Sequence, residues 1–267
     1  MFLTTSTHAD ILFFTDKGKA YQIKAYELPE GRRATKGKSI MNYLSLGGDE
    51  SVTSMLAMPK EMKAAEKLSL MMVTERGVVK KVEAQEFKDV RRSGLIAIKL
   101  QPKDQLLSAR FVEGGDDISL VAASGQSIRF KHTDVREMGR NAGGVRGMTL
   151  KGADKIVTAD VVKHSYKDAH LMVMGEQGYG KMTKLEEFKT QKRGGSGIRA
   201  MNVTPKTGKV MTGLIVEGRE GEIVAISKQS QVIRVNLNEV PVSGRATQGV
   251  RIMKLREGDS IASLITL

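Results

Sequence analysis

The 267-residue sequence contains no cysteine and no tryptophan, and only 4% of its residues are aromatic. Without cysteine, neither disulfides nor zinc sites with thiolate ligands can form. No apolar run approaches the roughly 18 residues of a membrane-spanning helix. The start of the chain lacks the basic and long apolar regions of a secretory signal. These absences exclude disulfide-stapled and membrane-spanning proteins, and they favour a cytoplasmic location.

Negative charge is also in the minority. The chain has 43 lysines and arginines against 30 aspartates and glutamates, a net charge of +13 with a pI near 9.8. Such a chain suits a polyanionic partner, either nucleic acid or an anionic membrane surface. A generically basic soluble protein would have the same net charge. The position of the basic residues along the chain must therefore distinguish it from a protein that binds polyanions.

One sequence unit occurs five times. Each unit begins with an apolar run, and the runs start 59, 48, 53 and 52 residues apart, at Ile11, Leu70, Ile118, Leu171 and Ile223. A polar turn follows each run, with Gly18, Gly77, Gly125, Gly178 or Ser230 at the same place. An alternating stretch such as Ile128-Arg129-Phe130-Lys131 comes next, and it indicates a half-buried strand.

A second glycine marks the following loop of each unit, at Gly37, Gly94, Gly144, Gly197 and Gly249. We expect a third strand after it, as in residues 96–100, 148–150 and 252–255. A fourth strand would close the unit, as in residues 106–112, 156–162, 210–216 and 261–267. No segment has the pattern of a long helix.

Four short strands in a unit of about 53 residues are typical of propellers. We therefore predict an all-β fold, a propeller-like array of four-stranded blades, with about five blades in this chain. The prediction treats residues 1–267 as a single domain with repeats at about 9–58, 68–112, 117–162, 169–216 and 221–267. Residues 59–67 would form an insertion loop. Phe2 and Leu3 stand where a fourth strand would end, so we expect an earlier unit before Met1.

Positive charge is concentrated around the second glycines, in segments that we call the glycine loops: residues 31–38, 90–99, 138–147, 189–199 and 241–251. These 50 residues contain 15 basic side chains and no acidic one, whereas the rest of the chain contains 28 basic and 30 acidic residues. Repeat symmetry predicts that the loops occupy equivalent places and form one basic belt. Solubility alone would favour mixed charges, so the loops indicate a surface that binds polyanions.

Duplex DNA is the polyanion that fits this composition best. Proteins that bind single strands or read RNA sequence stack bases on aromatic side chains, and this chain has few of them. No predicted helix could enter a major groove, and no amphipathic helix could anchor in a membrane. Arginines, lysines and glycines at which the backbone can approach closely suit phosphate groups. The sequence thus predicts a duplex that is held by its backbone and bent along the belt.

One glycine loop carries a specific motif, Gln191-Lys192-Arg193-Gly194-Gly195-Ser196-Gly197. It resembles the Q-R-R-G-G-K-G box of the C-terminal domain of the DNA gyrase A subunit. Residues 7–19, 178–183 and 244–250 are similar to other motifs of that family, and the resemblance covers essentially the whole chain. The family's main box lies in a first blade, whereas this heptad is a later, box-like copy with Lys192 and Ser196 in place of arginine and lysine.

The resemblance implies a β-pinwheel, a relative of the propeller with a different strand exchange between blades. It implies a non-catalytic domain that wraps duplex DNA around a basic rim and presents it for ATP-dependent strand passage and negative supercoiling. The implied partners are duplex DNA, the ATPase B subunit of an A2B2 assembly, and the rest of the gyrase A subunit. The implied location is cytoplasmic and nucleoid-associated, without membrane contact.

Carried over by position, the implied DNA contacts are Arg32, Arg33, Lys36, Lys38, Arg91, Arg92, Arg140, Arg146, Lys192, Arg193, Arg199, Arg245 and Arg251. Two alternatives stay open. One is the C-terminal domain of the topoisomerase IV A subunit, which shares the fold. The other is a protein-interaction propeller whose basic belt meets an acidic partner.

No enzyme site is predicted. Residues 31–39 look like a phosphate-binding P-loop, but five residues instead of four separate the glycines and no helix pattern follows. No nucleophile has a neighbouring base, and the histidines lack metal-ligand spacing: His8, His132, His164 and His170. We expect no catalytic residue, no metal and no cofactor in this chain.

Overall fold

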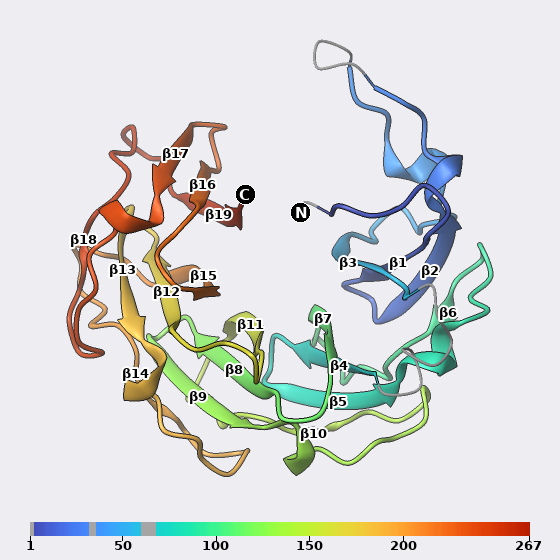
Figure 1. The fold of residues 1–267 in the computed structure, drawn as a ribbon, viewed down its shortest axis with the longest axis horizontal. Coiled ribbons are helices and arrows are strands. Elements are labelled where there is room, and N and C mark those ends of the chain that lie inside the picture. Colours follow the sequence, from blue (N-terminus) through green and yellow to red (C-terminus); the bar gives the residue numbers. More distant parts are fainter. Residues whose placement is uncertain (1–2, 32–35, 60–67) are drawn as a thin grey trace. The chain divides into compact units, whose positions relative to one another are not determined.

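The computed structural model describes residues 3–31, 36–59 and 68–267. These residues form two compact units. The first comprises the described residues of 1–74, 79–113 and 135–145, and the second comprises residues 75–78, 114–134 and 146–267. Both units are built from small antiparallel sheets (Figure 1).

The first unit contains two four-stranded sheets. One has the order β3-β1-β2-β6, formed by Val52–Ala57, Asp10–Thr15, Lys19–Lys24 and Leu95–Ile96. The other has the order β10-β5-β4-β7, formed by Val145–Arg146, Val78–Glu83, Ser69–Thr74 and Leu106–Val112. Val78 and Arg146, at two of its strand ends, are assigned to the second unit.

The second unit contains three sheets. The sheet β11-β8-β9-β14 is formed by Ile156–Val162, Asp117–Ala122, Gln126–Lys131 and Ile198–Arg199. The sheet β15-β12-β13-β18 is formed by Val210–Glu217, Ala169–Gly175, Tyr179–Lys184 and Val250–Arg251. The sheet β17-β16-β19 is formed by Val232–Asn236, Glu222–Ser227 and Ile261–Thr266. The predicted all-β fold with five repeated sheets is confirmed, although the fifth has three strands among the described residues.

The first two strands of each repeat form a tight hairpin because the turn residue adopts a left-handed conformation. Gly178, between β12 and β13, has a φ of +78°, and a Cβ there would lie 2.2 Å from the carbonyl oxygen of Met253. Ser230 holds the same place in the fifth repeat with a φ of 63°, which is unfavourable for a residue with a Cβ. Glycine at the other turns thus meets both a conformational and a steric requirement.

The strands that follow the second glycines complete the preceding sheet. We call β6, β10, β14 and β18 the exchange strands, because each pairs with the second strand of the previous repeat. The ranges predicted for these strands, 96–100, 148–150 and 252–255, are wrong, because the observed exchange strands begin earlier and have only two residues each. After each strand the chain bends under the previous turn. In the fourth sheet, for example, the backbone N–H groups of Ile252 and Met253 both donate to the carbonyl of Gly178. The strand exchange that the family resemblance implies is confirmed.

Apolar side chains fill the space between sheets within each unit. In the first unit, Phe14 of β1 and Phe87 are fully buried and meet edge to face, with ring centroids 5.5 Å apart. In the second unit, Met172 of β12 and Met182 of β13 are fully buried in one cluster with Ile223 of β16. Each repeat therefore buries its hairpin against a neighbouring one.

Among the described residues, helical structure is limited to single 3₁₀ turns: η1 (Ala25–Glu27), η2 (Ile40–Asn42), η3 (Ala84–Phe87), η4 (His132–Asp134), η5 (Leu185–Glu187) and η6 (Leu237–Glu239). All except η2 directly follow the second strand of a repeat. None of the helices in the described ranges is long and apolar enough to cross a membrane.

Candidate nucleic-acid interface

Three of the exchange strands end on an exposed arginine: Arg146 in β10, Arg199 in β14 and Arg251 in β18. A left-handed glycine precedes each of these strands, with φ values of +87° at Gly144, +73° at Gly197 and +77° at Gly249. The glycine lets the loop turn back onto the previous hairpin. The repeated fold thus presents one exposed arginine at the same place of the exchange strand in three repeats.

Successive repeats of the second unit are joined by hydrogen bonds between these arginine-bearing segments. The guanidinium Nη1 of Arg193 donates to the carbonyl of Arg146 at 2.9 Å, and Nη1 of Arg245 donates to the carbonyl of Arg199 at 3.1 Å. Arg193 and Arg245 each lie four residues before the second glycine of their loop. The same contact therefore recurs in two repeats, and it places cationic side chains in a regular succession.

The box-like motif, residues 191–197, packs closely on the third repeat. The N–H of Gln191 donates to the carbonyl of Arg129 at 2.7 Å, and that of Gly194 donates to the carbonyl of Gly147 at 2.6 Å. A Cβ at Gly197 would lie 2.3 Å from the carbonyl oxygen of Ser127. The glycines of the motif thus let the loop lie against a strand, while the Lys192 side chain remains 92% exposed.

The first unit holds the remaining predicted contacts. Lys36, Lys38, Arg91 and Arg92 are exposed, and Arg140 is half-buried. Arg32 and Arg33 lie outside the described residues. The structure therefore brings Arg146, Lys192, Arg193, Arg199, Arg245 and Arg251 into the succession of the second unit, while the contribution of the first-unit residues to a common belt stays a prediction.

The loops have acidic partners that the sequence analysis missed. A carboxylate from the 3₁₀ turn of one repeat pairs with a cation of the next glycine loop: Glu27 with Arg92, Glu86 with Arg140 at 3.0 Å, Asp134 with Lys192 at 3.4 Å, and Glu187 with Arg245 at 4.0 Å. These acids lie outside the loops in sequence and beside them in space. Their recurrence just after each alternating strand is the signal that could have revealed them.

Two lysines of equivalent position are fully buried under the loops. Lys181 Nζ donates to the carbonyls of Gly244 at 2.5 Å and Arg245 at 2.8 Å. Lys80 Nζ donates to the carbonyl of Ala97 at 2.7 Å and to that of Arg140. Burial lowers the pKa of each lysine to about 8. The alternating pattern of β5 and β13 predicts that one side of each strand faces solvent. In the structure, the glycine loop of the next repeat covers that side and buries the lysine.

A groove of about 620 Å³ adjoins the last of these arginines. The Arg251 guanidinium lies 5.3 Å from the ring centroid of Tyr179 and donates to its hydroxyl at 3.0 Å. Lys206 Nζ lies 5.2 Å from the same centroid. Lys254 and Arg256 also line the groove, together with Glu176, Glu257 and Asp259, so charges of both signs surround it.

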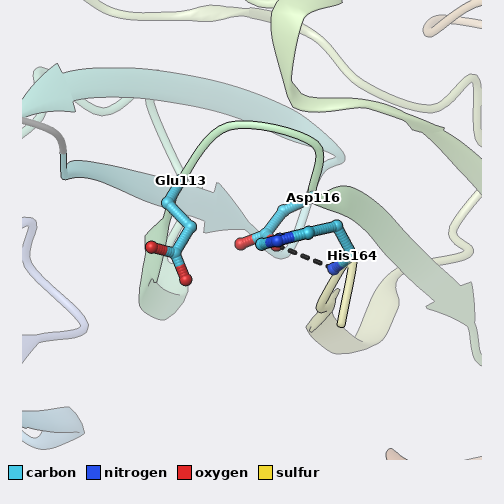
Figure 2. Close-up of side chains that lie close together, drawn as sticks. All are labelled: Glu113, Asp116 and His164. Atoms are coloured by element: carbon cyan, nitrogen blue, oxygen red, sulfur yellow. Dashed lines mark hydrogen bonds and ion pairs between the residues drawn. The ribbon is translucent and has the colours of Figure 1, made fainter. Parts of the chain in front are cut away.

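Histidine in the second unit has a structural role. His164 contacts the buried carboxylate of Asp116, with its backbone N–H 3.0 Å and its Nδ1 3.4 Å from Oδ1 (Figure 2). Lys163 Nζ lies 2.9 Å from the other oxygen. The carboxylate charge is thus balanced by Lys163, while the backbone of His164 holds the first oxygen in place.

Fold and surface together define the class of protein: an array of propeller-type sheets that exchange strands and carry cations on the exchanged segments. The family model described as DNA gyrase C-terminal domain, beta-propeller, matches residues 9–57, 69–113, 116–163, 169–217 and 221–267. The chain belongs to this family.

Curated relatives support the same assignment. The DNA gyrase A subunit of Staphylococcus epidermidis is 35% identical over 262 residues, which cover 98% of this chain and 29% of that protein. The DNA gyrase A subunit of Staphylococcus aureus is 34% identical over the same length, again with 98% and 29% coverage. The chain therefore spans 29% of the length of these relatives.

Two solved structures are similar. The DNA gyrase A C-terminal domain matches with a TM-score of 0.83 and 28% identity, over 98% of this chain and 84% of that one. The C-terminal domain of DNA topoisomerase IV matches with a TM-score of 0.87 and 24% identity, over 98% and 80%. The second likeness shows the shared fold, while sequence identity links this chain to the gyrase domain.

Proposed function

We propose that this chain binds duplex DNA through its phosphate backbone and bends it along the glycine loops. The observation that carries the proposal is the succession of arginines in the second unit: Arg146, Arg199 and Arg251 are exposed, and the half-buried Arg193 and Arg245 donate to the carbonyls of Arg146 and Arg199. Guanidinium groups bind phosphate oxygens with paired hydrogen bonds. Contacts of this kind position a duplex without reading its bases.

In the longer protein, the bound segment would be presented for ATP-dependent strand passage that introduces negative supercoils. The partners would be the ATPase B subunit together with the rest of the gyrase A subunit, and the setting would be the nucleoid in the cytoplasm. The 35% identity to a staphylococcal gyrase A subunit, over 98% of this chain, supports gyrase over topoisomerase IV.

The first test is the salt dependence of duplex binding, followed by fluorescence anisotropy. The logarithm of the affinity should fall steeply with the logarithm of the salt concentration, with a slope of about −0.9 for each phosphate engaged. The double variant Arg193→Glu, Arg245→Glu should lose binding, because it reverses charge where two repeats meet. Lys167→Glu changes an exposed lysine of the same unit outside the glycine loops, and it should bind nearly as the unaltered chain does.

Thermal melting of both variants separates lost binding from lost fold. A shallow salt slope, or full binding by the folded double variant, would contradict the proposal. Polyglutamate as a competitor tests the protein-interaction alternative, since a surface for acidic partners would prefer it to DNA. Wrapping is tested separately, by sealing nicked circles in the presence of the chain and measuring the change in linking number.

A further inference from the structure

The loops that carry Arg140 and Arg245 run along the strands that contain the buried lysines. Residue Lys81 of β5 forms a parallel bridge with Glu137, and Met182 of β13 forms the corresponding bridge with Val242. In the fourth repeat the Thr183 hydroxyl then donates to the carbonyl of Ser243, and past each bridge the lysine ammonium donates to the loop backbone. In both repeats this contact is made with the carbonyl of the arginine itself.

Other repeats do without a lysine at this position. The third residue after the turn is Lys80 or Lys181 in two repeats, whereas it is Tyr21, Ile128 and Ile233 in the remaining three. Ile128 is fully buried. A sheet of this kind therefore forms with an apolar side chain there, and burying an ammonium group, which is unfavourable by itself, is not needed for the fold.

The loop over Ile128 is held in another way. There the arginine side chain binds inward, since Nε of Arg193 donates to the carbonyl of Asp134 at 2.9 Å. Over Lys181, the buried lysine binds the loop backbone from below at Gly244 and Arg245. Lys181 thus binds the loop backbone from inside the sheet, where the neighbouring repeat uses the Arg193 side chain instead.

We propose that Lys80 and Lys181 are positioning residues of the nucleic-acid interface: each buried ammonium fixes the backbone of the arginine-bearing loop above it and adds a weakly screened positive charge beneath the phosphate-binding surface. This inference rests on the proposed binding of duplex DNA. A charge shielded from water acts over a longer distance than one on the surface. Approaching phosphates would in turn favour the protonated form of each lysine.

Because bound phosphates favour protonated lysines, the affinity for DNA should depend on pH in a way that the surroundings of the two lysines define. Arg245 and Glu187 are the charged groups that face Lys181, and Arg140 and Glu86 face Lys80. Arginines and glutamates keep their charges between about pH 7 and pH 10. At about pH 8 and above, where each buried lysine has lost its proton in half or more of the free chains, DNA binding should therefore take up protons.

The experiment compares the full 267-residue chain with Lys181→Met and Lys80→Met. Duplex affinity is measured by anisotropy near pH 7 and pH 9.5, and proton uptake by calorimetry in two buffers of different ionisation enthalpy. We expect each variant to bind about tenfold more weakly near pH 7, as for one buried charge within about 10 Å of a phosphate. We also expect each to take up fewer protons near pH 9.

Two controls match the variants. Lys184→Met removes an exposed lysine from the same strand, β13, and Ile128→Met changes an apolar side chain at the same repeat position. Both should change affinity less than about twofold, as expected for surface charges and volume-conserving changes, and both should keep the proton uptake. If a lysine variant fails to fold, proton uptake by the unaltered chain decides.

Folded lysine variants that bind as the unaltered chain does would overturn the inference and leave the proposed function intact. An unaltered chain that binds without proton uptake near pH 9 would do the same. An unaltered chain that does not bind duplex DNA would overturn both.

Discussion

Glu187 of one repeat is bound to Arg245 of the next. Its Oε2 accepts the backbone N–H of Arg245 at 3.1 Å and lies 4.0 Å from the guanidinium Nε. The contact orients a cation of the candidate interface and at the same time cancels part of its charge. Because the carboxylate lies at the surface, with 42% of the side chain exposed, the energetic effect of the ion pair is small.

Glu187→Gln should strengthen duplex binding about two- to fivefold at low salt, because it removes a negative charge from the interface and keeps an oxygen for the Arg245 N–H. Anisotropy titrations at low salt measure the gain. Glu239→Gln is the matched control: it changes the equivalent residue of η6, whose carboxylate accepts a hydrogen bond from Asn236 at 3.0 Å. A weakened Glu187→Gln variant would show that positioning outweighs charge.

Arg199→Ala should remove one phosphate contact. Arg199 is exposed, and its carbonyl still accepts the bond from Arg245 after the change. The salt slope should become shallower by about 0.9, and affinity should fall equally for duplexes of different sequence. Lys167→Ala serves as the comparison. A loss confined to particular sequences would indicate base contacts instead.

Gly178→Ala should lower the free energy of unfolding of the second unit by more than about 2 kcal/mol. A left-handed alanine costs about 1–2 kcal/mol, and its Cβ would also clash. That Cβ would lie 2.2 Å from the Met253 carbonyl oxygen. Gly218→Ala is a control for conformation alone, since Gly218 has a φ of +64° and open space around it. Urea unfolding should show the larger loss for Gly178→Ala, and equal losses would show that the loop moves aside.

Stability should rise with pH above about 8. A lysine whose pKa is lowered in the folded chain is less protonated there than in the unfolded chain, so its burial penalty declines as pH rises from about 8. The gain is at most about 1.4 kcal/mol per pH unit for each lysine. Lys181→Met should flatten this rise in urea unfolding between about pH 7.5 and pH 9.5, below the range in which tyrosine titrates. If the free energy of unfolding rose with pH as steeply in Lys181→Met as in the unaltered chain, Lys181 would not be the source of the rise.

The repeat and its strands could be predicted from the sequence because each strand encodes its own signal. Apolar runs such as residues 70–73 and the turn glycines recur at regular spacing, and the hairpins β4–β5 and β12–β13 form as expected. Alternation, however, describes one strand and not its partners. It could not show that Val250–Arg251 completes the sheet of the fourth repeat, since pairing across repeats depends on where the chain bends after Gly249.

The candidate site was predictable in its residue types and only partly in its geometry. Clustering of cations in the glycine loops is visible in the sequence. Glu86 and Arg140 are 54 residues apart and meet through the exchange, which no local pattern encodes. Lys80 likewise belongs to a strand that reads as solvent-facing on one side, yet the loop of the next repeat buries it.

Strand exchange sets where this chain can be divided. A piece ending at Glu217, the end of the fourth matched segment, would lack β18 and leave the outer edge of β13 without its partner. It would also lack the Met253 backbone that lies under the Gly178 turn. Self-sufficient pieces are therefore offset from the sequence repeats by one exchanged segment. Engineers who delete, duplicate or transplant a sheet from this chain would need to carry residues 241–255 with the hairpin that they complete, rather than with the repeat that encodes them.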